Sequence, residues 1–221
     1  MTCNEFINAY WAHYISLEKE FLKTTTFVSL EHDNGETYSD AFLKLLLAVG
    51  SEIDVTMKFF CELLVTTFSG NNISQYRSCI NTNRPDFFNQ EVSVREGAMV
   101  IKPWLNRNAT NDIISPFWWD AYNNCKHKRL ERGKINGKIK AYFKFANLEY
   151  TLAALGGLYQ TILYSYKIIA DREGKQVVVP LPGSRLFKLT GPDWSNVDFF
   201  NDFAFYFDNG SLCIESSTIY Y

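Results

Sequence analysis

The chain has 221 residues, 47% hydrophobic and 16% aromatic, enough apolar surface for a folded domain that needs no disulfide or metal. Its formal net charge is −2, whereas a protein dedicated to duplex DNA usually carries a clear basic excess. Any contact with nucleic acid is therefore expected to be local.

The cysteines and the apolar segments predict a soluble protein of the cytoplasm, without a metal or another cofactor. Five cysteines are scattered and form no CxxC pair, which argues against a disulfide framework and a zinc site. A reducing cytoplasm is the simplest setting, and the first residues lack the pattern of a signal peptide. The most apolar stretch, 152–170, is interrupted by Gln160 and Lys167, which predicts a buried helix and not a membrane span.

Two long helices are predicted at the start of the chain. Thr2-x-x-Glu5 is a capping-box pattern, and behind it apolar residues recur at helical spacing to about residue 23. Ser39 is a good N-cap for a second helix, whose one internal break is Gly50 and which reaches the turn at 69–72. Helices of this length are typical of bundles.

The middle of the chain predicts a small mixed insertion, at about residues 73–114. A short helix is expected at 73–80, followed by a small hairpin that pairs 92–94 with 98–101. Residues 103–112 are expected to form a loop.

The next two helices are predicted from cap and connector signals. Ser115 and Pro116 form a strong helix start, and this helix is expected to end near Gly133. A connector at 133–137 then leads to a final long helix from about Lys138 to about Ala170.

The last part of the chain is richer in strand-forming residues. Residues 203–207 and 211–214 flank Asn209-Gly210, a dipeptide that suits a tight hairpin turn. The fold class is therefore mainly α: an up-down helical bundle domain at 1–171 with a small β insertion, followed by a β-rich C-terminal extension at 172–221.

The most informative motif lies in the helix after Pro116. Asn123 and His127 are one turn apart and share a face, with Lys126 beside them and Arg129 close by. An imidazole can take a proton from a ribose 2′-hydroxyl or give one to a leaving oxygen. The cations can hold the phosphate, and the amide can orient the imidazole or bond the substrate. The same cluster also fits an ordinary solvated helix surface.

The basic stretch 126–144 carries eight cations against a single acid, Glu131. It predicts either a solvated loop and helix start or a patch that faces an anion. The cations are Lys126, Lys128, Arg129, Arg132, Lys134, Lys138, Lys140 and Lys144.

Glu52, Asp54 and Lys58 form a second polar group, in the middle of the second helix. Glu52 and Asp54 point to different faces, and a buried carboxylate needs a cationic or hydrogen-bonding partner. The cluster around His127 is the obvious source of one. Alternatively, Asp54 and Lys58 pair with each other on the helix surface. His13 is expected to be a half-buried core residue.

The run 118–129, followed by a helix at 146–148, resembles the HEPN superfamily. Its sharpest element is the pattern Tyr-Asn-x-x-Lys-His-x-Arg that begins at Tyr122. Residues 14–18 and 51–54 look like the first two helices of uncharacterised bacterial members. The resemblance covers most of residues 1–170.

The resemblance implies a helical bundle, often a homodimer, whose active members cut RNA without a metal at the dimer cleft. Such proteins occur in toxin–antitoxin, abortive-infection and other defence systems, so phage defence and an antitoxin or other partner protein are expected. The first hypothesis is thus a metal-independent ribonuclease or RNA-associated defence protein. In this hypothesis His127 is the general acid or base, and Lys126 and Arg129 hold the phosphate. Asn123 orients the imidazole, and the carboxylates of the second helix support the site.

The second hypothesis is a non-catalytic helical interaction module. Its motivation is that Asp120, Ala121 and Tyr122 stand where active members carry an arginine. The polar cluster is then a buried network that fixes helix register or a dimer interface, and the aromatic segment 199–207 is a docking surface. A third reading is a small-molecule or nucleotide pocket between helices.

Overall fold

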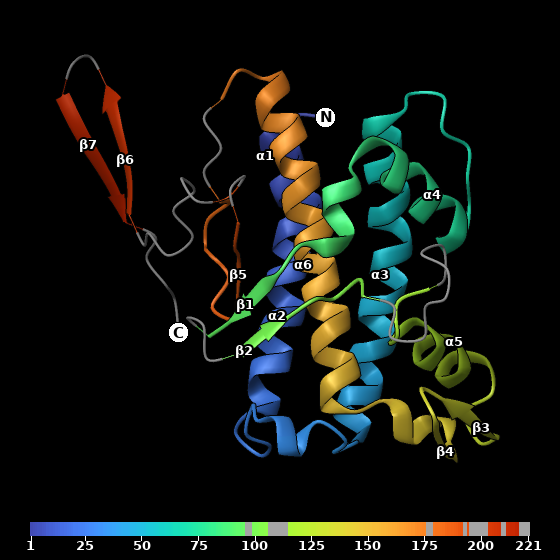
Figure 1. Cartoon of the computed structure of the whole chain (residues 1–221). Helices are drawn as coiled ribbons and strands as arrows, with labels where there is room; N and C mark the ends of the chain where they lie inside the picture. Colours follow the sequence, from blue (N-terminus) through green and yellow to red (C-terminus); the bar gives the residue numbers. More distant parts are fainter. Residues whose placement is uncertain are drawn as a thin grey trace.

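In the computed structural model, the described residues are 1–95, 99–105, 115–175, 179–191 and Trp194, together with the backbone of 203–208 and 211–216. The protein is mainly helical and carries small antiparallel sheets, which confirms the predicted fold class at this level (Figure 1). Whether the bundle is of the HEPN type stays a prediction.

The first two predicted helices begin where their cap signals lie, whereas the helix predicted to start at Ser115 and Pro116 begins only at Trp119, without a side-chain cap. Thr2 and Glu5 form the predicted capping box, and the Ser39 hydroxyl accepts from the backbone N–H of Phe42 at 3.1 Å. In chain order the helices are α1 (Cys3–Phe6), α2 (Ala12–Thr24), α3 (Asp40–Leu64), α4 (Ile73–Asn83), α5 (Trp119–His127) and α6 (Leu148–Arg172).

Shorter helical turns connect these helices. A π-helical turn, η1 (Ile7–Trp11), joins α1 to α2, so the first helix is continuous, as predicted. The 3-10 turns are η2 (His32–Asn34), η3 (Pro85–Asn89) and η4 (Tyr142–Phe145). Helix α3 ends at Leu64, earlier than expected, and α4 extends beyond its predicted end.

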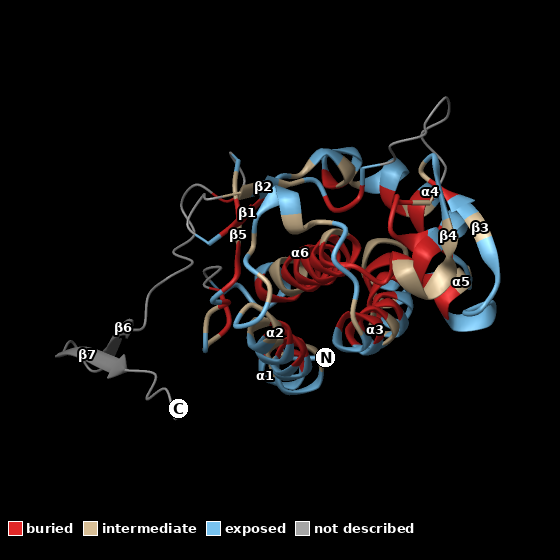
Figure 2. Cartoon of the chain, turned by 90° about the horizontal axis from the view of Figure 1, so that it is seen from below, coloured by how far each residue is buried: buried red, intermediate tan, exposed pale blue. Residues whose placement is uncertain are grey.

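Helix α6 lies at the centre, with α2 and α3 on one side and the three-stranded sheet on another (Figure 2). All residues from Tyr150 to Ser165 are buried, as expected for a helix that is apolar all round. Gly156 allows the end of β2 to approach closely, because a Cβ there would lie 2.9 Å from Cδ1 of Ile101. The predicted buried helix is confirmed over this range. None of the described helices combines the length and apolar character that a membrane crossing requires.

A three-stranded antiparallel sheet covers one side of α6. Its order is β2 (Met99–Ile101), β1 (Val92–Val94) and β5 (Phe187–Leu189), with Ser93 opposite both Val100 and Lys188. The predicted hairpin of β1 and β2 is therefore confirmed.

Strand β5 follows the helical part of the chain, yet it packs into the same core. Val179, Leu186 and Trp194 are buried with it. The described residues 179–191 thus share the hydrophobic core of the helices, while the division into domains stays a prediction.

The prediction of one helix from Lys138 to Ala170 is wrong. Residues 132–141 form an antiparallel hairpin of β3 (Arg132–Ile135) and β4 (Lys138–Ala141), and α6 begins only at Leu148. Asn136 and Gly137 adopt φ angles of 48° and 84°, as a tight primed hairpin turn requires. The Asn147 side chain then caps α6 by accepting from the N–H of Tyr150 at 2.9 Å.

The C-terminal hairpin is present in the backbone. Strands β6 (Phe203–Asp208) and β7 (Ser211–Ser216) pair antiparallel, with Asp208 opposite Ser211, as predicted. The turn at 209–210 and most of the predicted loop at 103–112 lie outside the described residues.

Candidate functional site

Helix α5 lies at the edge of the molecule beside the β3–β4 hairpin (Figures 1 and 2). Its N-terminal end is fixed by tryptophan side chains: Trp118 is fully buried, and its indole N–H donates to the carbonyl of Pro103 at 2.7 Å. The helix ends at His127, not near Gly133, and the chain runs on directly into β3.

Asn123 and His127 both lie on α5, one turn apart, so the predicted shared face exists. Asn123 is half-buried and His127 is exposed at the last position of the helix. Within the described part of the chain, His127 has no hydrogen bond or ion pair. Its imidazole is open to a ligand, and no described side chain fixes its orientation.

Lys126 and Arg129 are held by neighbouring groups. The Lys126 ammonium donates to the Tyr122 hydroxyl at 3.4 Å and lies 5.6 Å from the centre of that ring. The prediction that Arg129 lies on the same side of the helix as His127 is wrong, because α5 ends at His127, two residues before Arg129. Its Nε instead donates to the carbonyl of Cys125 at 3.5 Å, where the C-terminal carbonyls of the helix attract a cation.

Cys125, two residues before His127, does not add a nucleophile to this site. Its thiol is fully buried and donates to the carbonyl of Tyr142 at 3.1 Å. Burial raises the pKa of the thiol to about 11, so the reactive thiolate is scarce near neutral pH.

The hairpin divides the cations of the basic stretch between two faces. In an antiparallel pair, residues opposite each other point to the same face, and successive residues alternate. Lys134 lies opposite Ile139, and Ile135 lies opposite Lys138. Ile135 is buried, so its face is the inner one, and Lys134 stands on the outer face.

The two lysines of the inner face share one carboxylate, which offsets one of their two charges. Lys138 pairs with one oxygen of Glu36, and the Lys140 ammonium lies 2.9 Å from the other. The hydrogen bond from Lys138, and to a smaller extent the one from Lys140, lowers the pKa of Glu36 to about 2. Local sequence patterns cannot indicate this pairing, because Glu36 is about a hundred residues away along the chain.

The outer face keeps its charge. Arg132 and Lys134 are exposed, and neither has an ion pair with a described residue. Leu130, 85% exposed, and Ile139, 66% exposed, lie among these cations. The surface from Lys126 to Lys134, together with Ile139, is called the α5–hairpin surface below; it combines unpaired cations with exposed aliphatic side chains.

The second polar group lies elsewhere. A Glu52 carboxylate oxygen is 3.7 Å from Nε2 of His13. The His13 side chain is 49% exposed on the surface of α2, so the prediction of a core residue is wrong. Asp54 and Lys58 are exposed, and among the described residues they form no ion pair with each other. No described hydrogen bond or ion pair links Glu52, Asp54 or Lys58 to the α5–hairpin surface.

Other ligand sites in the described residues are limited. A hollow of about 660 Å³, a size that suits a small molecule, lies between the first turns of α6, β2 and the segment 30–36. Four carboxylates stand among its lining residues against two lysines, which disfavours a phosphate-bearing ligand. The described part of the chain holds no group of three or more His, Cys, Asp or Glu side chains placed to bind a metal.

No protein-family model, curated protein or solved structure matches this chain. The grounds for a function are therefore the residues and geometry of the α5–hairpin surface.

Proposed function

We propose that the protein binds RNA through the α5–hairpin surface and is a HEPN-like, metal-independent ribonuclease. The observation that supports this most is the division of the hairpin lysines. Lys138 and Lys140 both pair with Glu36, which offsets one of their two charges, while Arg132 and Lys134 stay exposed without an ion-pair partner among the described residues.

The chemistry of RNA fits such a surface. Cations that neutralise phosphates release counterions, and this term dominates the affinity of most nucleic-acid complexes. Leu130 and Ile139 offer apolar contacts to unstacked bases, which single-stranded RNA presents and a duplex hides. The net charge of −2 keeps the rest of the protein from attracting nucleic acid broadly.

In the proposed reaction, His127 exchanges a proton with the ribose 2′-hydroxyl or the leaving oxygen. Lys126 and Arg129 lie beside it along the chain and offset the negative charge that develops on the phosphate. Asn123, one turn away on the same face, bonds the substrate or orients the imidazole. By the same resemblance, two copies form a homodimer that brings both histidines to one cleft, and an antitoxin-like protein regulates the site.

The first test is binding of a labelled single-stranded RNA, measured by fluorescence polarisation. Replacing both outer cations (Arg132→Ala with Lys134→Ala) is expected to weaken binding at least about tenfold and to flatten its salt dependence. The matched control removes the inner pair (Lys138→Ala with Lys140→Ala), the same number of charges from the same hairpin. Equal effects of the two double variants would contradict the assignment of the outer face.

A second candidate, a non-catalytic interaction module, is favoured by the exposed Leu130 and Ile139. Exposed aliphatic side chains within a polar rim suit a protein partner. The buried-network form of this candidate is wrong for the described residues, because His127 and its basic neighbours are exposed. In that case the double variant Leu130→Ser with Ile139→Ser would abolish self-association or partner binding, and the variant protein would remain fully folded.

A further inference from the structure

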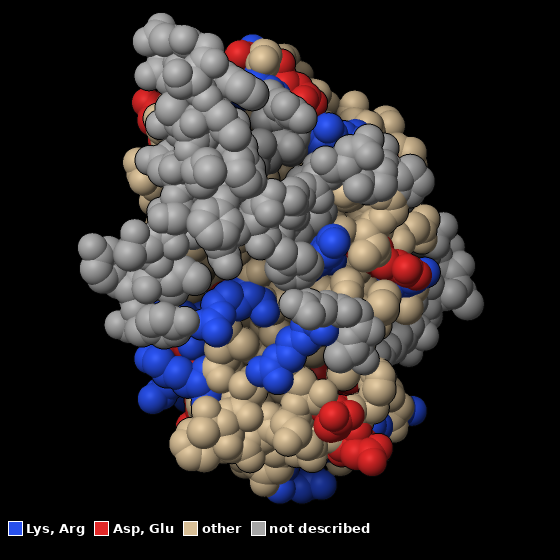
Figure 3. Space-filling model, turned by 90° about the vertical axis from the view of Figure 1, so that its left-hand side faces the viewer, with Lys and Arg blue, Asp and Glu red and all other residues tan. Residues whose placement is uncertain are grey.

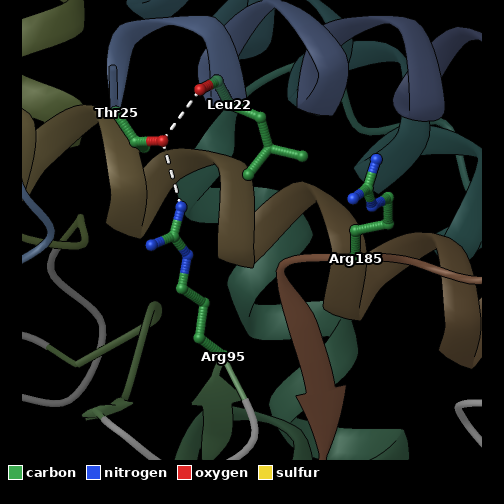
Figure 4. Close-up of a pocket in the computed structure, with 4 residues that line it drawn as sticks. All are labelled: Leu22, Thr25, Arg95 and Arg185. Carbon is green, nitrogen blue, oxygen red and sulfur yellow. Dashed lines mark hydrogen bonds between the residues drawn. The ribbon is translucent and has the colours of Figure 1, made fainter. Parts of the chain in front are cut away.

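A second basic site lies away from the α5–hairpin surface. A hollow of about 470 Å³ is lined, among the described residues, by Leu22, Thr25, Arg95 and Arg185 (Figure 4). It lies between the end of α2, the end of β1 and the chain that enters β5, on the left-hand side of Figure 1. Seen from that side, Lys and Arg side chains gather in the middle of the described surface (Figure 3).

Arg95 is fixed at the edge of this hollow. Its backbone N–H donates to the carbonyl of Leu186 at 2.9 Å, and its φ of 45° lies in the left-handed region that non-glycine residues seldom adopt. One guanidinium nitrogen donates to the Thr25 hydroxyl at 3.0 Å, and that hydroxyl donates to the carbonyl of Leu22 at 2.8 Å. Among the described residues, one hydrogen bond holds the guanidinium in place, and its other N–H groups have no partner.

Arg185 is anchored through its backbone, and its side chain has no hydrogen bond or ion pair with a described residue. Its N–H donates to a carboxylate oxygen of the buried Glu18 at 2.6 Å. The neighbouring Ser184 hydroxyl lies 3.1 Å from the Tyr14 hydroxyl, a second buried tie to α2. Figure 4 shows the two guanidinium groups on either side of Leu22, both rising toward α2.

The described residues that line the hollow carry only positive charge. Neither Arg95 nor Arg185 has an ion pair with a described residue, and no described lining residue is acidic. A guanidinium presents a planar fork of N–H donors that matches two oxygens of a phosphate. Leu22 lies between the two forks and offers an apolar contact, and the volume is that of a small-molecule site.

We propose that this hollow binds a small phosphate ester, whose phosphate contacts Arg95 and Arg185 and whose organic part lies against Leu22. The site is separate from the α5–hairpin surface and does not depend on the proposed function. The opposing explanation is that Arg95 only caps the C-terminal end of α2, where backbone carbonyls attract a cation. That explanation gives no role to the side chain of Arg185.

Calorimetric titration of the full chain with adenosine monophosphate and with inorganic phosphate, at constant ionic strength, tests the proposal. Wild type is expected to bind the nucleotide at least about tenfold more tightly than phosphate, because only the ester gains the apolar contact. Arg95→Gln and Arg185→Gln should each weaken nucleotide binding at least about tenfold. Arg185→Lys keeps the positive charge but loses the planar fork of donors, so its affinity should lie between those of wild type and Arg185→Gln.

Lys19→Gln is the matched control, since it removes one exposed cation from α2, the helix that carries Leu22, at a position outside the hollow. Its affinity should equal that of wild type. Melting curves in sodium chloride show whether each variant folds, and RNA binding should be the same in all of them. No binding of either anion to folded wild type, or equal losses in Lys19→Gln and Arg185→Gln, would overturn the proposal.

Discussion

The ring of Tyr122 on α5 packs directly against Gly50 on α3. A Cβ at residue 50 would lie 2.3 Å from Cδ2 of that ring, a distance that real contacts do not reach. The one internal glycine of α3 is therefore the place where α5 can approach. Because α5 leads straight into the hairpin, this contact helps to set the position of the whole α5–hairpin surface.

Gly50→Ala is expected to destabilise the protein by about 1–2 kcal/mol. Replacing glycine by alanine in a helix interior would by itself stabilise the folded protein by about 0.5–1 kcal/mol. Overpacking against the buried Tyr122 ring destabilises it by about 1–3 kcal/mol, which is the larger effect. Urea unfolding measures the difference. In a Tyr122→Ala background the obstacle is gone, so the same substitution should become stabilising; a loss of equal size in both backgrounds would contradict the contact.

Asn136 is expected to hold the hairpin against the helical part. Its side-chain amide donates to the Tyr150 hydroxyl at 2.9 Å and to the carbonyl of Phe117 at 3.2 Å, from a left-handed backbone. Asn136→Gly keeps the turn but loses these hydrogen bonds, which should lower the free energy of unfolding by about 1–2 kcal/mol. Asn136→Ala loses the same bonds and also strains the left-handed backbone, which should lower it by about 1 kcal/mol more. Thermal unfolding should rank wild type above the glycine variant and the glycine variant above the alanine variant; the reverse order of the two variants would refute the turn assignment.

Glu18 should make stability depend on pH. Burial raises the pKa of its carboxyl above the ordinary value of 4.5, and one carboxylate oxygen has no hydrogen-bond partner among the described residues. The folded state therefore binds this proton more tightly than the unfolded state. The resulting stabilisation is present below pH 4.5 and is lost as the pH rises through the raised folded value.

Glu18→Gln removes this titration and keeps the shape of the side chain. The free energy of unfolding of wild type, relative to the variant, should fall as the pH rises above 4.5, as measured by urea unfolding at several pH values. Circular dichroism at each pH checks that both proteins begin folded. A difference that is constant, or that grows with pH, would show that Glu18 is not held in an apolar setting.

Local patterns predicted the elements that local forces decide. The caps at Thr2 and Ser39 mark the first two helices, and the apolar run after residue 150 marks the buried one. The hairpin at 132–141 was missed because its lysines favour a helix, although Asn136-Gly137 between Ile135 and Lys138 is the same turn signal that was used near the C-terminus.

Long-range contacts were beyond the reach of such patterns. The pairing of Ser93 with Lys188 joins strands from distant parts of the chain. For the candidate site, helical spacing correctly placed Asn123 and His127 on one face. It could not show that Glu52 pairs with His13, or that Glu36 pairs with both inner lysines, because both depend on tertiary packing.

Cleavage of a mixed panel of tRNA and single-stranded RNA in EDTA, by wild type and His127→Ala side by side, tests the central claim most directly. The account predicts metal-independent cutting by wild type, about a hundredfold or more slower in the variant, as expected for loss of a general acid or base. RNA binding should stay within about twofold, because no phosphate-binding cation is removed. Equal cutting by the two proteins, or none by folded wild type that binds the RNA, would contradict the ribonuclease proposal.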